Sequence, residues 1–155
     1  MLNLVLYAPE IPANTGNISR TCAVTNTALH LIKPLGFSLS DKALKRAGLD
    51  YWPMLDVRLY ECLEDFLSAH VRENLWLIET GGKLRYDEAK YEPGDFIMFG
   101  QETKGLPATL LAAHPQKVLR IPMVPRPAAR SLNLSNAAAL VLYEAYRQLN
   151  FSGLD

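Results

Sequence analysis

Residues 95–114, DFIMFGQETKGLPATLLAAH, contain the pattern that decides the fold class. The run from Asp95 to Gly100 is rich in large apolar residues, which predicts a strand buried on both faces. A polar loop follows as far as Gly105, and Pro107 then stands at the first turn of a helix, where proline is tolerated. A buried strand joined by a short loop to a helix is the repeating unit of a parallel sheet.

The same alternation continues in both directions along the chain. Strands are predicted at 2–7, 29–32, 57–60, 75–79, 95–100 and 118–122, and helices at 18–26, 41–48, 61–70, 107–114 and 134–150. We therefore expect an α/β fold, with a mostly parallel sheet and helices on both faces. Such sheets bind ligands beyond the carboxyl ends of their strands. The loops after Tyr7, Glu79, Phe99 and Ile121 should carry the chemistry.

Length and charge limit the classes of protein that fit. A chain of 155 residues favours one domain spanning residues 1–155. Lys and Arg together number 16, as do Asp and Glu, so RNA binding would need a local basic patch. No apolar run approaches the ~20 residues needed to cross a bilayer, and the N-terminus lacks a basic leader. We expect a cytoplasmic protein with no membrane partner.

Several common kinds of site are not indicated. Cys22 and Cys62 are not in a metal-ligand spacing, and the three histidines are scattered, so no metal is expected. The chain contains no GxSxG elbow, no GxxxxGK[ST] phosphate loop and no GxGxxG fingerprint. The missing glycine fingerprint disfavours an ordinary doubly wound nucleotide enzyme, which is one alternative for a fold of this class.

Residues 9–20, PEIPANTGNISR, form the first polar loop. Thr15 or Asn17 is predicted to cap a helix that begins near Ile18. Arg20 would then lie in the first helical turn, where the helix dipole disfavours a cation by about 0.3–1 kcal/mol. A cation in that position indicates an anionic partner, although an exposed arginine can also tolerate a misfit of this size.

The segment before the last helix, residues 121–136, has the sequence IPMVPRPAARSLNLSN. Its three prolines predict a rigid, extended approach to the helix. Asn133 or Ser135 is expected to cap the helix, and Ser131 adds another small polar group. Within the helix, Ala138, Val141, Leu142, Ala145 and Leu149 have the spacing of a buried face. The ordinary interpretation of Tyr143 is packing at the edge of that face.

Together the three loops resemble a known family. The stretch NTGNISR after the first strand, FGQETKGLP after a central strand, and IPM leading to SLNLSNA resemble the three motifs of the SpoU branch of the SPOUT RNA methyltransferases. The resemblance covers essentially the whole chain. It implies a C-terminal trefoil knot, S-adenosylmethionine as methyl donor, and a homodimer. The knot rests on the resemblance alone, because threaded chains are almost absent among folds.

The resemblance also assigns residues. Cofactor-binding positions fall on Ile78, Gly100, Glu102, Ile121, Ser131, Asn133 and Ser135. Arg20 matches the motif arginine and is expected to act in catalysis, with Asn14 lining the target nucleotide. A guanidinium stays protonated, so we expect Arg20 to bind phosphate and orient the ribose hydroxyl rather than remove its proton. Tyr143 matches a tyrosine beside the cofactor and the dimer interface, and Glu102 is expected to brace its loop.

Within the branch, the chain is similar to the smallest members. That similarity implies 2′-O-methylation of the wobble nucleotide, cytidine or carboxymethylaminomethyluridine at position 34, with tRNA-Leu isoacceptors as substrates. Basic residues that two subunits could pool on the anticodon stem-loop are Lys42, Lys45, Arg46, Arg126 and Arg130. The alternatives are an RNA-binding module that kept the fold without the reaction, or a 2′-O-methyltransferase for another tRNA or rRNA position.

Overall fold

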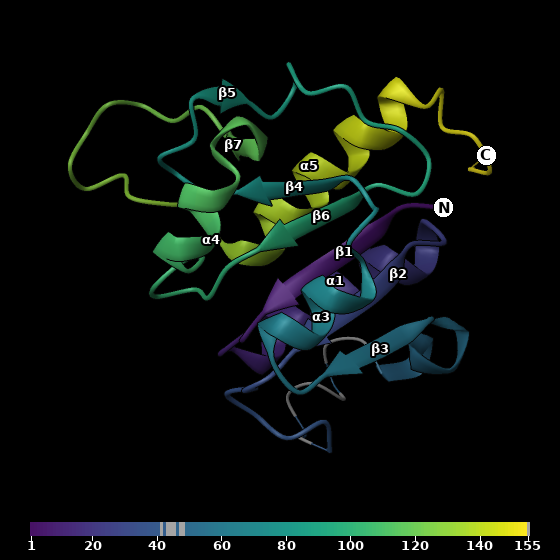
Figure 1. Ribbon diagram of the computed structural model, residues 1–155. Helices are drawn as coiled ribbons and strands as arrows, with labels where there is room; N and C mark the ends of the chain where they lie inside the picture. The colour runs from purple at the N-terminus through teal and green to yellow at the C-terminus, as the bar shows by residue number, and fades with distance from the viewer. Residues whose placement is uncertain (41, 43–45, 47–48, 155) are drawn as a thin grey trace.

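The structure is a computed structural model that describes residues 1–40, 42, 46 and 49–154 (Figure 1). In chain order its elements are β1 (Asn3–Tyr7), α1 (Pro12–Val24), β2 (Ala28–Ile32), the 3₁₀ helix η1 (Leu49–Met54), β3 (Val57–Tyr60), α3 (Leu63–Ala69), β4 (Leu75–Ile78), β5 (Leu84–Arg85), β6 (Phe96–Phe99), α4 (Ala108–Ala113), the 3₁₀ helix η2 (Pro115–Lys117), β7 (Val118–Arg120) and α5 (Leu134–Gln148). The short helix predicted at 41–48 lies mostly outside the described residues.

The named strands form one sheet in the order β3-β2-β1-β6-β4-β7-β5, and every pairing is parallel. The α/β class predicted from the sequence is confirmed. Because all the strands run the same way, their carboxyl ends meet at one edge of the sheet (Figure 1). The loops that leave the neighbouring strands β1 and β6 diverge, because β1 is followed by β2 on one side of the sheet and β6 is followed by β7 on the other. Ligands of parallel sheets bind at such a point.

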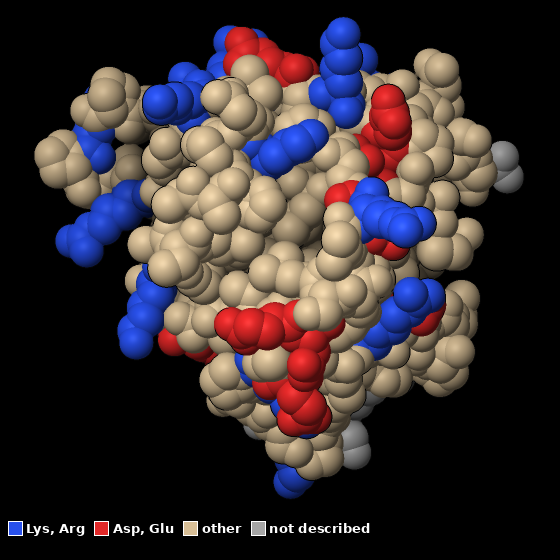
Figure 2. All heavy atoms as spheres, in the orientation of Figure 1, with Lys and Arg blue, Asp and Glu red and all other residues tan. Residues whose placement is uncertain are grey.

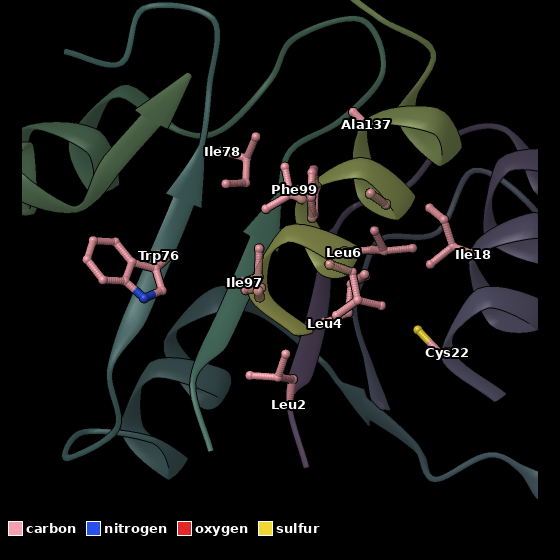
Figure 3. Packing of buried hydrophobic residues seen from close by; sticks show 14 of the residues in the cluster. Leu2, Leu4, Leu6, Ile18, Cys22, Trp76, Ile78, Ile97, Phe99 and Ala137 are labelled. Atoms are coloured by element: carbon pink, nitrogen blue, oxygen red, sulfur yellow. The ribbon is translucent and has the colours of Figure 1, made fainter. Parts of the chain in front are cut away.

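Helices cover both faces of the sheet, and the two-residue period of the strands divides the core between them. Leu4 and Leu6 of β1 point to the face covered by α1 and α5, where Ile18 and Ala137 belong to the same buried cluster (Figure 3). Val5 points to the opposite face. There it joins a second cluster built from alternate strand residues, from helices α3 and α4 and from the loop before α4: Ile32, Phe66, Leu77, Phe96, Met98, Leu106, Leu110 and Val118.

Helix α1 begins at Pro12 and not near Ile18, so the predicted start and cap were wrong. Proline suits the first helical turn because its missing N–H would have no intrahelical partner there. Ile11 occupies the N-cap position and gives no side-chain cap. The carboxylate of Glu102, from the loop after β6, instead accepts from the Ile11 N–H at 3.0 Å. A cap supplied from the other half of the chain leaves no local signal.

The remaining differences are small. Strand β5 has two residues, too few to show an alternating pattern, and it was not predicted. Asn133 caps α5 as one of the two expected candidates. On α5 the predicted face is buried at Ala138, Val141, Leu142 and Ala145. Tyr146 is also buried, and its hydroxyl donates to the Thr25 carbonyl at 2.7 Å.

Candidate active site

A cavity of about 300 Å³ lies at the carboxyl edge of the sheet. It opens where the loops after β4, β6 and β7 meet the N-terminal ends of α1 and α5. Its apolar walls include Ile78, Phe99, Ile121, Leu134 and Ala137, and its polar groups include Asn14, Glu79, Gln101, Glu102, Ser131 and Asn133. The loops predicted to carry the chemistry therefore meet in one place.

All but one of the residues predicted to bind the cofactor line this cavity. They are Ile78, Gly100, Glu102, Ile121, Ser131 and Asn133. Ser135 does not line it. Its hydroxyl donates to Oδ1 of Asn133 at 2.7 Å, so the side chain belongs to the cap of α5.

Two glycines allow the loop after β6 to close tightly. A Cβ atom at Gly100 would lie 2.2 Å from the carbonyl carbon of Gly105, so no side chain fits there. Gly105 itself has a φ of 67°, in the left-handed region that favours glycine. Gln101 and Gly105 exchange two backbone hydrogen bonds of 3.0 and 3.1 Å. The result is a compact turn whose backbone forms one wall of the cavity.

Asn14 joins three parts of the chain at the cavity. Its Nδ2 donates to Oε1 of Glu102 at 3.2 Å, and its Oδ1 accepts from Nδ2 of Asn133 at 3.0 Å. Because a carboxylate only accepts hydrogen bonds, the orientation of the amide is fixed. Asn133 in turn caps α5 by accepting from the N–H of Ser135 at 2.9 Å. A chain of polar contacts thus holds α1, the loop after β6 and α5 together.

Arg20 does not line the cavity. It lies on α1 six residues beyond Asn14, about 9 Å further along the helix axis. The expectation that it occupies the first turn was wrong, because α1 begins at Pro12. The side chain is exposed, and its guanidinium carbon lies 5.0 Å from the ring centroid of Tyr51 in a cation–π contact. Arg20 therefore faces solvent beside η1, on a surface that a large ligand can reach.

Tyr143 also lies outside the cavity. Its side chain on α5 is 45% exposed. It borders a hollow with Val24, Phe151, Gly153 and Leu154, near the C-terminal ends of α1 and α5. Within one chain, Tyr143 is therefore part of an apolar surface and not of the candidate active site.

The basic residues predicted to bind RNA lie on two segments. Lys42 and Arg46 are exposed, and Lys45 lies outside the described residues. Arg126 and Arg130 are exposed on the loop between β7 and α5, and within the described part of the chain neither forms an ion pair. Figure 2 shows basic side chains standing out from this loop, at the left of the molecule.

Some cavity residues were not predicted, although each lies within three residues of the end of a strand. The carboxylate of Glu79 accepts from the N–H of Leu106 at 3.0 Å and from the N–H of Thr80 at 2.9 Å, which ties the loops after β4 and β6 together. Gln101 and Met123 also line the cavity. Their position after β6 and β7 was the signal that could have found them.

Two wider searches concern only the described residues. No group of His, Cys, Asp and Glu side chains among them is arranged to hold a metal ion. No helix in the described ranges is long and apolar enough to span a bilayer.

Comparisons with known proteins point to one family. A profile of the SpoU rRNA methylase family matches residues 1–143. The tRNA (cytidine(34)-2′-O)-methyltransferase of Escherichia coli is 50% identical over 154 residues, covering 99% of this chain and 97% of that protein. The enzyme of the same name from Saccharophagus degradans is 49% identical over 154 residues, covering 99% of each chain.

Solved structures agree. A structure described as giving insight into the 2-OH methylation of C/U34 on tRNA has a TM-score of 0.91 and 50% sequence identity, with 97% of each chain covered. An AdoMet-bound rRNA methyltransferase from Sinorhizobium meliloti has a TM-score of 0.83 and 26% identity, covering 96% of this chain and 56% of that one.

Proposed function

The chain belongs to the SpoU rRNA methylase family, and from this premise we propose that it methylates the 2′-oxygen of the wobble cytidine of tRNA, with S-adenosylmethionine as the methyl donor. The observation that carries the proposal is the cavity in which the three motif loops meet around Asn14. Two relatives of about this length, at 50% and 49% identity, are named for the same reaction. Family membership also implies a trefoil knot in the C-terminal part of the chain.

The residues of the cavity suit S-adenosylmethionine. Its volume of about 300 Å³ lies at the lower end of the range for small-molecule sites. The apolar side chains Ile78, Ile121 and Leu134 can pack against a purine, and backbone groups of the loop closed by Gly100 can bind polar edges. When bound, the cofactor supplies an activated methyl group. The protein must then hold the ribose hydroxyl in line with that group.

Asn14 is placed to contact the target nucleotide. It is 4% exposed and lines the cavity, and its amide is held on both sides by Glu102 and Asn133. A side chain with so little freedom can orient a ligand at small entropic cost. Glu102 acts mainly through its bonds to α1 and Asn14, which supports the expectation that it braces its loop.

Arg20 is proposed to bind the RNA backbone next to the target ribose. Its guanidinium is exposed, and stacking on Tyr51 restricts its movement. A planar cation with a fixed direction suits bidentate binding of phosphate. Bound in this way, the phosphate sets the position of the neighbouring ribose, and the positive charge favours loss of the hydroxyl proton.

We further propose that the protein acts as a homodimer. Val24, Tyr143 and Phe151 are 55%, 45% and 43% exposed around the hollow near the C-terminal ends of α1 and α5. A second copy covering this surface would bury these apolar side chains and bring its basic loop to the same RNA. Substituting Val24→Glu should shift the dimer towards monomer in sedimentation velocity, whereas Val71→Glu, an exposed site outside this surface, should not. Equal dissociation of both variants would exclude this interface.

One assay tests the reaction directly. Purified protein is incubated with labelled S-adenosylmethionine and tRNA from a strain that lacks the modification, including tRNA-Leu isoacceptors, and the methylated nucleotide is mapped. We expect label on the ribose of nucleotide 34. Arg20→Lys should keep cofactor affinity but lose most turnover, because lysine is a point charge without the planar fork. Near-normal methylation by Arg20→Ala would show that Arg20 does not act in the reaction.

A further inference from the structure

Two carboxylates from distant loops each accept hydrogen bonds from backbone N–H groups of the segment that carries the other. Glu102, in the loop after β6, accepts from the N–H of Glu10 at 2.8 Å and from the N–H of Ile11 at 3.0 Å. Glu10, in the loop after β1, accepts from the N–H of Thr103 at 3.0 Å and from its hydroxyl at 2.9 Å. Each carboxylate therefore orders the loop that carries the other. We call these three residues, Glu10, Glu102 and Thr103, the latch.

The latch has no local substitute. Helix α1 begins without a side-chain cap of its own, so the carboxylate of Glu102 provides the first acceptor for its free N–H groups. Among the described residues, neither Glu10 nor Glu102 forms an ion pair. Two like charges are thus held at one junction by N–H and O–H donors alone. The contact depends on both loops keeping their positions.

The latch joins the two functional sides of the site. The loop after β6 lines the cavity through Gly100, Gln101 and Glu102, whereas α1 carries Asn14 and Arg20. Glu10 and Thr103 do not line the cavity. The turn between Gln101 and Gly105 keeps its own two backbone hydrogen bonds without them. Loss of the Glu10 or Thr103 side chain should therefore leave the cavity wall formed, but remove one of the two sets of hydrogen bonds that join it to the segment leading into α1.

We propose that Glu10 and Thr103 are positioning residues, which couple the order of the cofactor loop to the start of α1 and so to the groups that hold the RNA. The inference rests on the proposed function. Binding of S-adenosylmethionine would stabilise the loop after β6. Through the hydrogen bonds of the latch, it would then also restrict the movement of Glu10, Ile11 and Asn14. Cofactor and tRNA should then bind cooperatively, and the coupling should be reciprocal.

The test uses a matched pair at one position. Thr103→Val removes the hydroxyl at nearly constant shape, whereas Thr103→Ser keeps it. We expect Thr103→Val and Glu10→Gln to lower kcat/KM for tRNA by about threefold to thirtyfold, the range of coupling carried by single residues. The affinity for S-adenosylhomocysteine without tRNA should stay within about twofold, because neither residue lines the cavity. Thr103→Ser should behave as wild type, as should Glu61→Gln, an exposed carboxylate far from the latch in sequence.

The coupling is measured by titrating S-adenosylhomocysteine with and without tRNA. Wild type should bind it more tightly when tRNA is present, and Thr103→Val should lose that gain. Equal gains in both proteins would overturn the proposal. The proposal would also be overturned if Thr103→Val lost thermal stability and cofactor affinity in proportion to its loss of activity. That result would mean that Thr103 only stabilises the structure of the loops.

A second readout requires neither RNA nor turnover. In the unliganded protein, the amide protons of Glu10 and Ile11 should exchange with solvent at least about threefold faster in Thr103→Val than in Thr103→Ser, because opening of the latch frees them. Unchanged exchange would overturn the latch even if wild type methylates tRNA. A wild type that fails to methylate, but shows the exchange difference, would instead contradict the proposed function.

Discussion

His30 lies in the middle of β2 with no exposed surface. Its ring nitrogens lie 2.9 Å from the hydroxyl of Tyr60 and 3.2 Å from Oδ1 of Asn3. The pKa of His30 is lowered from 6.5 to about 4, first by burial and then by the nearby His70 and Arg58, against a smaller opposing effect of Asp56. The folded protein thus holds this imidazole neutral at pH values where the unfolded chain already protonates it.

This difference in pKa predicts a loss of stability in mild acid. As the pH falls below 6.5, the His30 imidazole becomes protonated in the unfolded chain, whereas in the folded chain it stays neutral until about pH 4. The free energy of unfolding should therefore fall by about 2 kcal/mol between about pH 7.5 and 5 through this residue alone. Urea unfolding at both pH values measures it. His30→Gln should show a smaller fall, whereas the exposed-site variant His114→Gln should show the full one.

A substitution at Gly100 gives a second prediction at the scale of a single residue. In Gly100→Ala the new methyl group would meet the backbone of Gly105, so the loop after β6 must move. We expect a loss of stability of about 1–3 kcal/mol, as for other overpacked sites. Affinity for S-adenosylhomocysteine should fall as well, because the displaced loop forms a wall of the cavity. Gly81→Ala is the control, since a Cβ there would meet nothing within 4 Å; thermal unfolding and calorimetry should find it unchanged.

The sequence predicts the roles of some residues better than the roles of others. Gly100 and Ile121 were assigned to the cofactor by the family resemblance, and both lie at the carboxyl ends of predicted strands, where ligands of parallel sheets bind. Arg20 was singled out by a wrong argument about the first turn, since the prediction placed the start of helix α1 near Ile18 and did not use Pro12, although proline is favoured at the first helical position. Glu79 was missed because its role depends on a backbone N–H in another loop.

At the scale of elements, one side chain at the start of α5 performs two functions. Oδ1 of Asn133 caps the helix, and Nδ2 of Asn133 holds Asn14. These functions can be separated by substitution, because aspartate keeps the acceptor but has no donor. The first helical turn is thus both a stability element and a part of the site.

We therefore expect Asn133→Asp and Asn133→Ala to differ in stability but not in function. Loss of the cap in Asn133→Ala should cost about 0.5–2 kcal/mol, whereas Asn133→Asp should keep most of it. Both variants should lose tRNA methylation, because both release Asn14. Chemical denaturation and single-turnover assays measure the two effects. Full activity in Asn133→Asp would show that the contact with Asn14 has no role in the reaction.

Strands and helices could be predicted where they are long enough to show a hydrophobic period or an uninterrupted apolar run. The buried runs that became β1 and β6 are uninterrupted, as expected for strands covered on both faces. β5 has two residues and gives no such signal. The start of α1 was missed because its capping acceptor, Glu102, follows by about 90 residues in the chain.

At the scale of the whole molecule, a formal charge of zero must be reconciled with a nucleic-acid substrate. The exposed cations Arg126 and Arg130 stand on a loop beside the cavity, and the acidic residues lie elsewhere on the face seen in Figure 2. Affinity for RNA comes largely from neutralised phosphates. A local concentration of positive charge can thus bind tRNA although the average over the surface cannot.

This arrangement predicts a steep dependence of tRNA binding on salt. Each phosphate contact should contribute about 0.7–0.9 to the slope of log affinity against log salt concentration. Arg126→Ala and Arg130→Ala should each lower that slope by about 1, without changing affinity for S-adenosylhomocysteine. Filter binding over a series of salt concentrations measures it. A flat response in wild type would exclude this loop as the RNA-binding surface.

The overall strand order could not be predicted, because it depends on which buried strands pair and not on what each strand contains. β6 lies between β1 and β4, although neither precedes or follows it directly in the chain. The α/β class needed only alternation, and the sequence contains that.

The position of α5 has a consequence for biosynthesis. The groups that complete the cavity, residues 131–137, are translated after every strand of the sheet. A ribosome that has just made β7 holds a chain with all its strands but no pocket, so the methyl donor cannot assist the early stages of folding. Binding of the methyl donor can stabilise the folded protein only after this final segment has packed against the sheet. A chain that binds the cofactor has therefore completed its folding.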